Sequence, residues 1–251
     1  MTALAKETNP LPPLAIRAWL RYDVVKRVID GLKPSNALEI GCGQGAFGAR
    51  LAGEVTYVGV EPDHSSYRVA CSRIEPRGGT VLNGIHSVVP PGSTYDLVCA
   101  FEVLEHIEDD RGALAEWVLF VRPGGHLALS VPAFQDRFGP MDTHAGHFRR
   151  YSPAELEARL LEAGLTDVRI TVYGWPLGYA LEVVRNRIAS KKLAEAEASV
   201  EELTAGSGRY LQPSGRVMGA LVNAVSTPFR YLQRVRPTAG TGLVAVARRP
   251  A

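Results

Sequence analysis

The sequence has few cysteines, almost no net charge and no long apolar run. Its three cysteines show no paired spacing, so we expect neither a disulfide framework nor a zinc knuckle. A formal net charge of +2 over 251 residues gives no reason to expect a nucleic-acid partner. No stretch approaches the roughly 18 uncharged apolar residues of a membrane span, and the first residues lack a secretory pattern. These absences predict a cytoplasmic protein without a membrane span.

Strand and helix patterns alternate along most of the chain. The segment Tyr95–Phe101 is almost continuously apolar, which is typical of a strand buried on both faces. The alternation predicts an α/β fold, a doubly wound, mostly parallel seven-stranded sheet of Rossmann-like type, with ligands at the carboxyl ends of its strands. The other expected strands are Asn36–Ile40, Thr56–Val60, Thr80–Leu82, His126–Val131, Val168–Tyr173 and Gly242–Arg248. The expected helices between and before them are Ala15–Leu32, Ala46–Ala52, His64–Arg73, Arg111–Val121 and Ser152–Ala163.

A glycine-rich loop, Glu39-Ile40-Gly41-Cys42-Gly43-Gln44-Gly45, follows the first expected strand. Its glycines allow tight turns and close approach to a ligand, which would then sit near the positive end of the next helix. Glu61, 20 positions after Gly41, ends the next strand and can accept hydrogen bonds from ribose hydroxyls. The spacing Gly41-x-Gly43-x-x-Ala46 also fits a dinucleotide fingerprint, so the glycines alone leave an NAD-dependent oxidoreductase open.

Glu39 favours S-adenosylmethionine over a dinucleotide as the expected cofactor. A carboxylate two residues before the first glycine would repel a pyrophosphate, whereas it favours the ammonium and sulfonium of S-adenosylmethionine.

Four segments in order carry a resemblance to a known family. The motifs Leu38–Gly45, Val58–Pro62, Tyr95–Val98 with Glu102–Ile107, and Leu119–Leu127 resemble those of the class I S-adenosylmethionine-dependent methyltransferases. The third resembles the branch that includes many small-molecule methylases, and the ordered match covers roughly residues 36–133. The resemblance implies a methyltransferase with S-adenosylmethionine as cofactor.

The resemblance also implies roles for individual residues. Glu39 would face the methionine ammonium, Glu61 the ribose, and Phe101 the methionyl part. Ile85 and His86 would flank the adenine. Many relatives carry Asp where this chain has Ile85, so we expect backbone and apolar contacts to hold the adenine here. The remaining cofactor contacts that we expect are Gly41, Cys42, Gly43, Gly45, Pro62 and Glu102.

The helical region before the last strand departs from a minimal sheet. We divide the chain into an N-terminal arm and helix (1–35), a cofactor-binding α/β core (36–175), a helical insertion or lid (176–237) and the last strand (238–251). The insertion is too long for a simple connection, and Leu181–Leu203 and Val217–Val235 have helical patterns. We expect its apolar run Val217–Val225 to pack on the sheet or to line the acceptor pocket.

The acceptor side has candidate residues after the fourth and fifth strands. Methyl transfer depends on positioning, and a base is needed only if the acceptor must lose a proton. His106 would either face the transferred methyl group or bond the backbone at a helix start. The segment Gly146-His147-Phe148-Arg149-Arg150-Tyr151 resembles a pattern in a subgroup of bacterial class I methyltransferases.

Three interpretations of this segment stay open. In the first, His144 or His147 accepts a proton, Arg149 or Arg150 steadies an anionic acceptor, and Tyr151 and Tyr22 add substrate contacts. In the second, Asp142, His144 and His147 bind a metal, although we expect none. In the third, the segment is a hydrogen-bonded clasp to the helix at Ser152.

The sequence therefore predicts methyl transfer to a small-molecule or lipid-linked acceptor, at oxygen, nitrogen or an activated carbon. The alternatives are an NAD-dependent oxidoreductase and a non-catalytic relative that binds the cofactor only.

Overall fold

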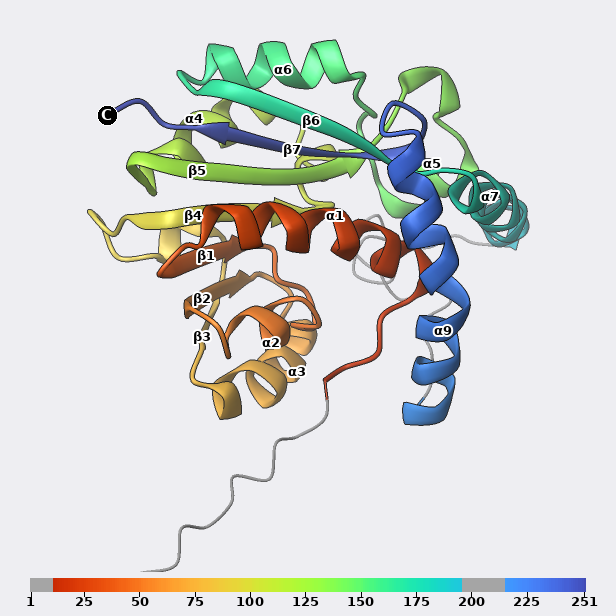
Figure 1. Ribbon diagram of the computed structural model, residues 1–251, viewed down its shortest axis with the longest axis horizontal. Helices are drawn as coiled ribbons and strands as arrows, with labels where there is room; N and C mark the ends of the chain where they lie inside the picture. Colours follow the sequence, from red (N-terminus) through yellow and green to blue (C-terminus); the bar gives the residue numbers. More distant parts are fainter. Residues whose placement is uncertain (1–10, 196–214) are drawn as a thin grey trace, which may run out of the picture.

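The computed structural model describes residues 11–195 and 215–251. Its sheet has seven strands in the order β3-β2-β1-β4-β5-β7-β6, and β7 alone runs antiparallel to its neighbours (Figure 1). The predicted doubly wound, mostly parallel sheet is confirmed. The strands are β1 (Asn36–Ile40), β2 (Thr56–Glu61), β3 (Thr80–Asn83), β4 (Tyr95–Phe101), β5 (Val121–Pro132), β6 (Thr166–Gly174) and β7 (Gly240–Arg248).

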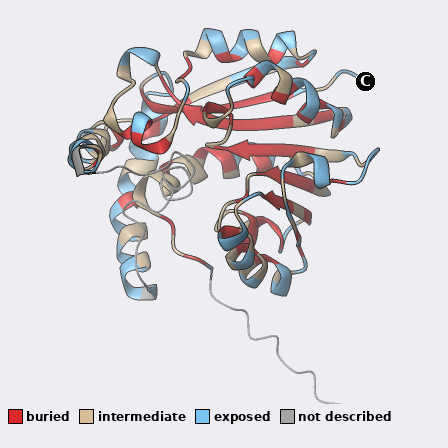
Figure 2. Ribbon diagram, turned by 180° about the vertical axis from the view of Figure 1, so that it is seen from behind, coloured by how far each residue is buried: buried red, intermediate tan, exposed pale blue. Residues whose placement is uncertain are grey.

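Helices cover both faces of the sheet. One apolar cluster joins the sheet to α1 (Ile16–Leu32), α2 (Gly48–Leu51) and α3 (His64–Ile74), and the other joins it to α4 (Asp110–Leu119) and α6 (Pro153–Glu162). Along β4, Val98 packs into the second cluster and Cys99 into the first, because successive side chains of a strand point to opposite faces. The strands are accordingly buried between helices whose outer sides are exposed (Figure 2).

The helix after the glycine loop is shorter than predicted. We expected Ala46–Ala52, but regular helix covers only Gly48–Leu51. The loop backbone has positive φ at Gly41, Gly43 and Gly45, and the first helical hydrogen bond after it runs from Ala49 N to Gly45 O. The loop therefore takes up residues that the sequence pattern assigned to the helix.

The insertion is helical where it is described. Helix α7 (Leu177–Glu195) packs against α5 (Pro140–Ala145), a short helix that the sequence did not indicate, and α9 (Arg216–Leu232) packs along α1. The part of the predicted helix 181–203 beyond residue 195 lies outside the described residues. None of the described helices is both long and apolar enough to cross a bilayer.

The expected packing of Val217–Val225 was wrong. Helix α9 contacts α1 rather than the sheet, so Val217 is 86% exposed and Leu221 and Val225 are also exposed. Figure 1 shows the first turns of α9 extending past the body of the protein, and the cavity described below has no lining residue from α9.

Candidate functional site

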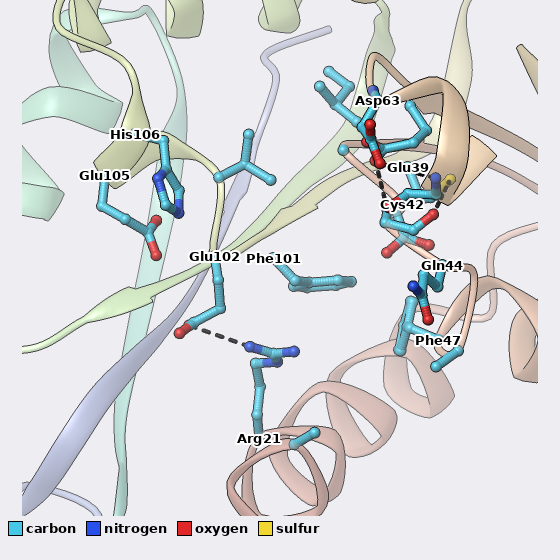
Figure 3. A pocket seen from close by; sticks show the side chains of 18 of the residues that line it. Arg21, Glu39, Cys42, Gln44, Phe47, Asp63, Phe101, Glu102, Glu105 and His106 are labelled. Atoms are coloured by element: carbon cyan, nitrogen blue, oxygen red, sulfur yellow. Dashed lines mark hydrogen bonds and ion pairs between the residues drawn. The ribbon is translucent and has the colours of Figure 1, made fainter. Parts of the chain in front are cut away.

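A cavity of about 710 Å³ opens at the carboxyl ends of β1, β2 and β4, beneath α1. Its volume lies within the range of small-molecule sites. Several separate parts of the chain line it (Figure 3). They are residues 13–25, the glycine loop, the end of β2 with the start of α3, the turn after β3, and the end of β4 with the residues that follow it. Trp117 of α4, Ala145 of α5, His147 after α5, and Leu181 and Arg185 of α7 complete the lining. Strand ends that lie apart in the sequence thus meet at one edge of the sheet.

The glycine loop forms one end of the cavity. Gly41, Cys42 and Gly43 line it, and the two glycines have φ of 69° and 55°. A Cβ at Gly43 would meet no atom within 4 Å, so the backbone there is open to a ligand. Gly45 was predicted as a cofactor contact but does not line the cavity, because a Cβ there would lie 2.7 Å from Ile74 Cδ1. Gly45 instead allows α3 to pack closely.

Two carboxylates flank the loop. Glu39 is buried and accepts a hydrogen bond from the Tyr57 hydroxyl at 2.5 Å, and burial raises the pKa of Glu39 to about 8. Glu61 accepts hydrogen bonds from the backbone N–H groups of Gly43 at 2.7 Å and Asp63 at 3.0 Å. Both residues line the cavity. This pair of carboxylates fits the ammonium and the ribose hydroxyls of S-adenosylmethionine.

Beyond Glu61, Pro62, Ile85 and His86 line the mouth of the cavity, where the side chain of Ile85 is exposed. His86 also pairs with Glu116 on α4.

Aromatic rings cross the middle of the cavity. The Phe101 ring packs edge-to-face on Phe47 with centroids 4.6 Å apart, and Phe47 packs on Tyr22 at 5.9 Å. All three line the cavity; Phe101 and Tyr22 were among the residues predicted for the site, whereas Phe47 was not.

Glu102 lines the cavity, but other side chains of the protein already bind its carboxylate. It has φ of 59° at the end of β4. Its carboxylate forms ion pairs with Arg17 at 2.9 Å and Arg21 at 3.4 Å and accepts a hydrogen bond from Ser130 Oγ at 3.1 Å. Burial opposes ionisation, but the two arginines outweigh it and lower the pKa of Glu102 to about 2. We predicted a cofactor contact for Glu102; the structure uses its carboxylate to hold α1 over the cavity.

Glu105 and two histidines form the far end of the cavity. The Glu105 carboxyl is fully buried and has no hydrogen-bond partner among the described residues. Burial and the charge of Glu102 raise the pKa of Glu105 well above its usual range. One ligand-type atom from each of Glu105, His106 and His147 lies within 4.8 Å of the others, so these three could share a cation. They differ from the set Asp142, His144 and His147 that we considered from the sequence.

His147 is held by a buried carboxylate. Its Nδ1 lies 2.8 Å from Asp142 Oδ1, and Arg150 binds the same carboxylate through Nε at 2.9 Å and Nη2 at 2.6 Å. Burial opposes ionisation of Asp142, but hydrogen bonds from His147 and Arg150 keep its pKa well below the usual range. The His147 ring packs edge-to-face on His106 at 4.6 Å, and both rings line the cavity. With Nδ1 engaged, Nε2 is the atom that His147 can offer to a ligand.

Four predicted acceptor-side residues do not line the cavity. His144 is buried elsewhere, and Arg150 is committed to Asp142 and Glu182. Arg149 pairs with Asp110 at 3.0 Å, and the Tyr151 hydroxyl donates to Asp110 at 2.9 Å. Their predicted roles in catalysis or substrate binding are therefore corrected: Arg149, Arg150 and Tyr151 tie the loop before α6 to α4, α5 and α7. The clasp interpretation expected a tie to the helix at Ser152, and the partners of these three side chains lie on other helices instead.

Sequence reasoning missed the cationic residues over the cavity. Arg17 and Arg21 are four residues apart on α1, a spacing that places both on one face of the helix. Arg185 comes from α7. The sequence contained the helical spacing but no sign that α1 and α7 would line the same cavity.

The sheet order, the glycine loop and the cavity at the strand ends define a Rossmann-like protein that binds a small ligand. Residues 16–170 match the family model described as "Methyltransferase domain", and the chain belongs to this family, the class I S-adenosylmethionine-dependent methyltransferases. It is accordingly an enzyme that transfers a methyl group from S-adenosylmethionine, and neither the NAD-dependent oxidoreductase nor the non-catalytic relative is favoured.

Curated relatives agree with this assignment, and a solved structure has the same fold. The ubiquinone biosynthesis O-methyltransferase of Vibrio parahaemolyticus is 28% identical over 189 residues, which are 66% of this chain and 79% of the relative. The protein of the same name from a Methylobacterium species is 39% identical over 147 residues, 51% of this chain and 57% of the relative. The N-methyltransferase NodS from Bradyrhizobium japonicum has the same fold, with a TM-score of 0.56, 19% identity and coverage of 92% and 95% of the two chains.

Proposed function

We propose that this methyltransferase methylates a hydroxyl oxygen of a small-molecule acceptor, with His147 as the proton acceptor. The observation that carries the proposal is the Asp142–His147 pair at the cavity wall, which leaves Nε2 available. A hydroxyl group must lose its proton during attack, so it gains from a positioned base. The name O-methyltransferase among the relatives supports oxygen as the accepting atom.

Glu39, Gly41, Cys42 and Gly43 would hold the methionyl part of the cofactor, since they form the closed end of the cavity. Glu61 would bind the ribose hydroxyls while its backbone hydrogen bonds fix its orientation. Phe101 would contact the methionyl chain; the residues proposed around the adenine are Pro62, Ile85 and His86. When bound, S-adenosylmethionine supplies a methyl carbon whose bond to sulfur breaks with both electrons staying on sulfur.

The acceptor end performs the proton chemistry. As the acceptor oxygen forms its new bond to carbon, its proton passes to His147 Nε2. Asp142 keeps the other ring nitrogen protonated and stabilises the resulting imidazolium, and Arg150 holds Asp142 in place. The arginines of α1 pair with Glu102, which keeps this helix over the reacting atoms and limits access of water.

Turnover of methyl-labelled cofactor with a panel of hydroxylated acceptors tests the proposal. Offering each acceptor with and without an isoprenoid tail measures whether a lipid-linked acceptor is used. We expect His147→Ala to lower kcat by about 10²- to 10⁴-fold, the usual contribution of a general base, and to leave the Kd of S-adenosylhomocysteine unchanged. His144→Ala, in the last turn of α5 three residues before His147 but outside the cavity lining, is the matched control and should keep near-normal turnover.

Normal turnover of His147→Ala would contradict the base. Loss of wild-type turnover on dialysis against a chelator, with recovery on adding Mg²⁺, would instead make His147 a metal ligand beside Glu105 and His106.

A further inference from the structure

Arg185 lines the cavity without a direct ion pair among the residues that the structure describes. It projects from α7, and no described residue forms a hydrogen bond or an ion pair with it. Burial and the nearby charge of Arg17 lower the pKa of Arg185 to about 10, so the guanidinium is charged at neutral pH. A half-buried, unpaired cation is unfavourable by itself, which points to an anion that binds there.

A second guanidinium beside it is only partly satisfied. Arg17 contacts Glu102 through Nη2 at 2.9 Å, but its Nε is buried without a hydrogen-bond partner among the described residues. Figure 3 shows Arg21 directed at the same Glu102 carboxylate. Arg17 and Arg21 therefore share the carboxylate of Glu102, and Arg185 has no ion pair among the described residues.

The three arginines come from two helices. Arg17 and Arg21 project from α1 and pair with Glu102 at the end of β4. Arg185 projects from α7, which packs against α5, and His147 follows α5 directly in the chain, so Arg185 lies on the His147 side of the cavity. The cavity arginine that has no ion pair among the described residues is therefore on the acceptor side.

We propose that Arg185, together with Arg17, forms a subsite for a carboxylate of the methyl acceptor. The preferred acceptor is then a hydroxylated acid, with its hydroxyl at His147 and its carboxylate at Arg185. The one cavity arginine without an ion pair among the described residues balances a monoanionic carboxylate rather than a dianionic phosphate, and its planar guanidinium matches the geometry of a carboxylate. We therefore assign to Arg17 of α1 and Arg185 of α7 the anion-binding role that the sequence suggested for Arg149 or Arg150. The assignment rests on the proposed methylation of a hydroxyl beside His147.

Binding to the full-length protein saturated with S-adenosylhomocysteine tests the subsite. Calorimetry would compare 3,4-dihydroxybenzoate and 4-hydroxycinnamate with their methyl esters. We expect each acid that binds to bind about 10- to 100-fold more tightly than its ester, as for hydrogen bonds to a charged group. Arg185→Met should remove this advantage and leave the ester and S-adenosylhomocysteine affinities unchanged. Arg187→Met, an exposed arginine two residues along the same helix, is the matched control and should behave as the wild type.

Each other outcome overturns the subsite. An equal loss for acid and ester in Arg185→Met would mean that the side chain only packs, and weaker S-adenosylhomocysteine binding would mean that it holds the cofactor. Failure of both acids to bind, or tighter binding of 4-hydroxyphenyl phosphate, would exclude the carboxylate assignment. Failure of the proposed function has a different signature: the acid binds through Arg185, but His147→Ala still methylates it.

Discussion

The two ends of the cavity are built by different means. The cofactor end consists mainly of backbone from one continuous stretch, the glycine loop and β2, with Glu39 and Glu61 on either side. The acceptor end consists of charged side chains from α1, the end of β4, the loop after α5, and α7. Short-range geometry determines the first, whereas the second exists only when four distant segments are packed together.

The comparison shows where specificity can change. Substitution in the glycine loop would disturb its packing, since a Cβ would lie 2.6 Å from Val103 at Gly41 and 2.7 Å from Ile74 at Gly45. Substitution of Arg185 or His147 would alter only which molecule is bound or how its proton leaves. A common cofactor end can therefore serve many acceptor ends.

The largest expected effect is at the acceptor end. Asp142→Asn should lower kcat by about 100-fold or more, because an amide cannot hold His147 in the tautomer with Nε2 free. Steady-state turnover with methyl-labelled cofactor measures the loss, and calorimetry should show an unchanged Kd for S-adenosylhomocysteine.

Because Asp142 also holds Arg150, this variant needs a control for folding. The double variant Asp142→Asn/His147→Ala should be scarcely slower than His147→Ala, since both residues act as one unit. Losses that multiply would mean that Asp142 acts on the fold and not through His147.

At the cofactor end, Gly45→Ala tests how much the close packing of the glycine loop on α3 contributes to stability. Its φ of 71° and the approach of 2.7 Å to Ile74 Cδ1 predict a fall of about 2–4 kcal/mol in the free energy of unfolding. Gly43→Ala has a similar φ of 55° but open space, so its loss should be only about 1–2 kcal/mol. Urea unfolding of the two variants without ligand gives the comparison. Equal losses would show that packing on α3 contributes nothing.

Glu61→Ala should weaken cofactor binding and leave the preference among acceptors unchanged. We expect S-adenosylhomocysteine binding to weaken by roughly 1–3 kcal/mol, because charge-assisted hydrogen bonds to the ribose are lost. Calorimetry measures the Kd, with the exposed Glu75→Ala as control. An unchanged Kd would place the ribose elsewhere, and a changed preference among acceptors would contradict the separation of the two ends.

The same separation explains what could be predicted from the sequence. The sheet, the glycine loop, Glu39 and Glu61 follow from strand and turn patterns, which are local. His147 was predicted as one of several candidates, since position after the fifth strand puts a residue on the correct edge but does not say which neighbours turn inward. Arg185 could not be singled out among the basic residues of the insertion, because an arginine on an exposed-looking helix has the same pattern whether it faces water or a cavity.

The smallest expected effect concerns pH and the cofactor end alone. Burial raises the pKa of Glu39 to about 8, so without ligand this carboxyl is mostly protonated at pH 7. The cofactor's ammonium favours the ionised form and lowers the pKa of Glu39, so binding below pH 8 releases a proton. Linkage then requires the affinity to rise with pH, by at most about tenfold per unit, and to level off above pH 8.

Calorimetric titration of S-adenosylhomocysteine between pH 6 and pH 8, repeated in two buffers of different ionisation enthalpy, measures both the affinity and the protons released. Glu39→Gln cannot ionise and should bind more weakly with a flat profile over this range. Affinity that falls as pH rises would mean that the ligand binds protonated Glu39, and then attraction between carboxylate and ammonium would not be what selects the cofactor. Because Glu39 lies at the closed end of the cavity, the acid-over-ester preference that we assign to Arg185 should not change with this variant.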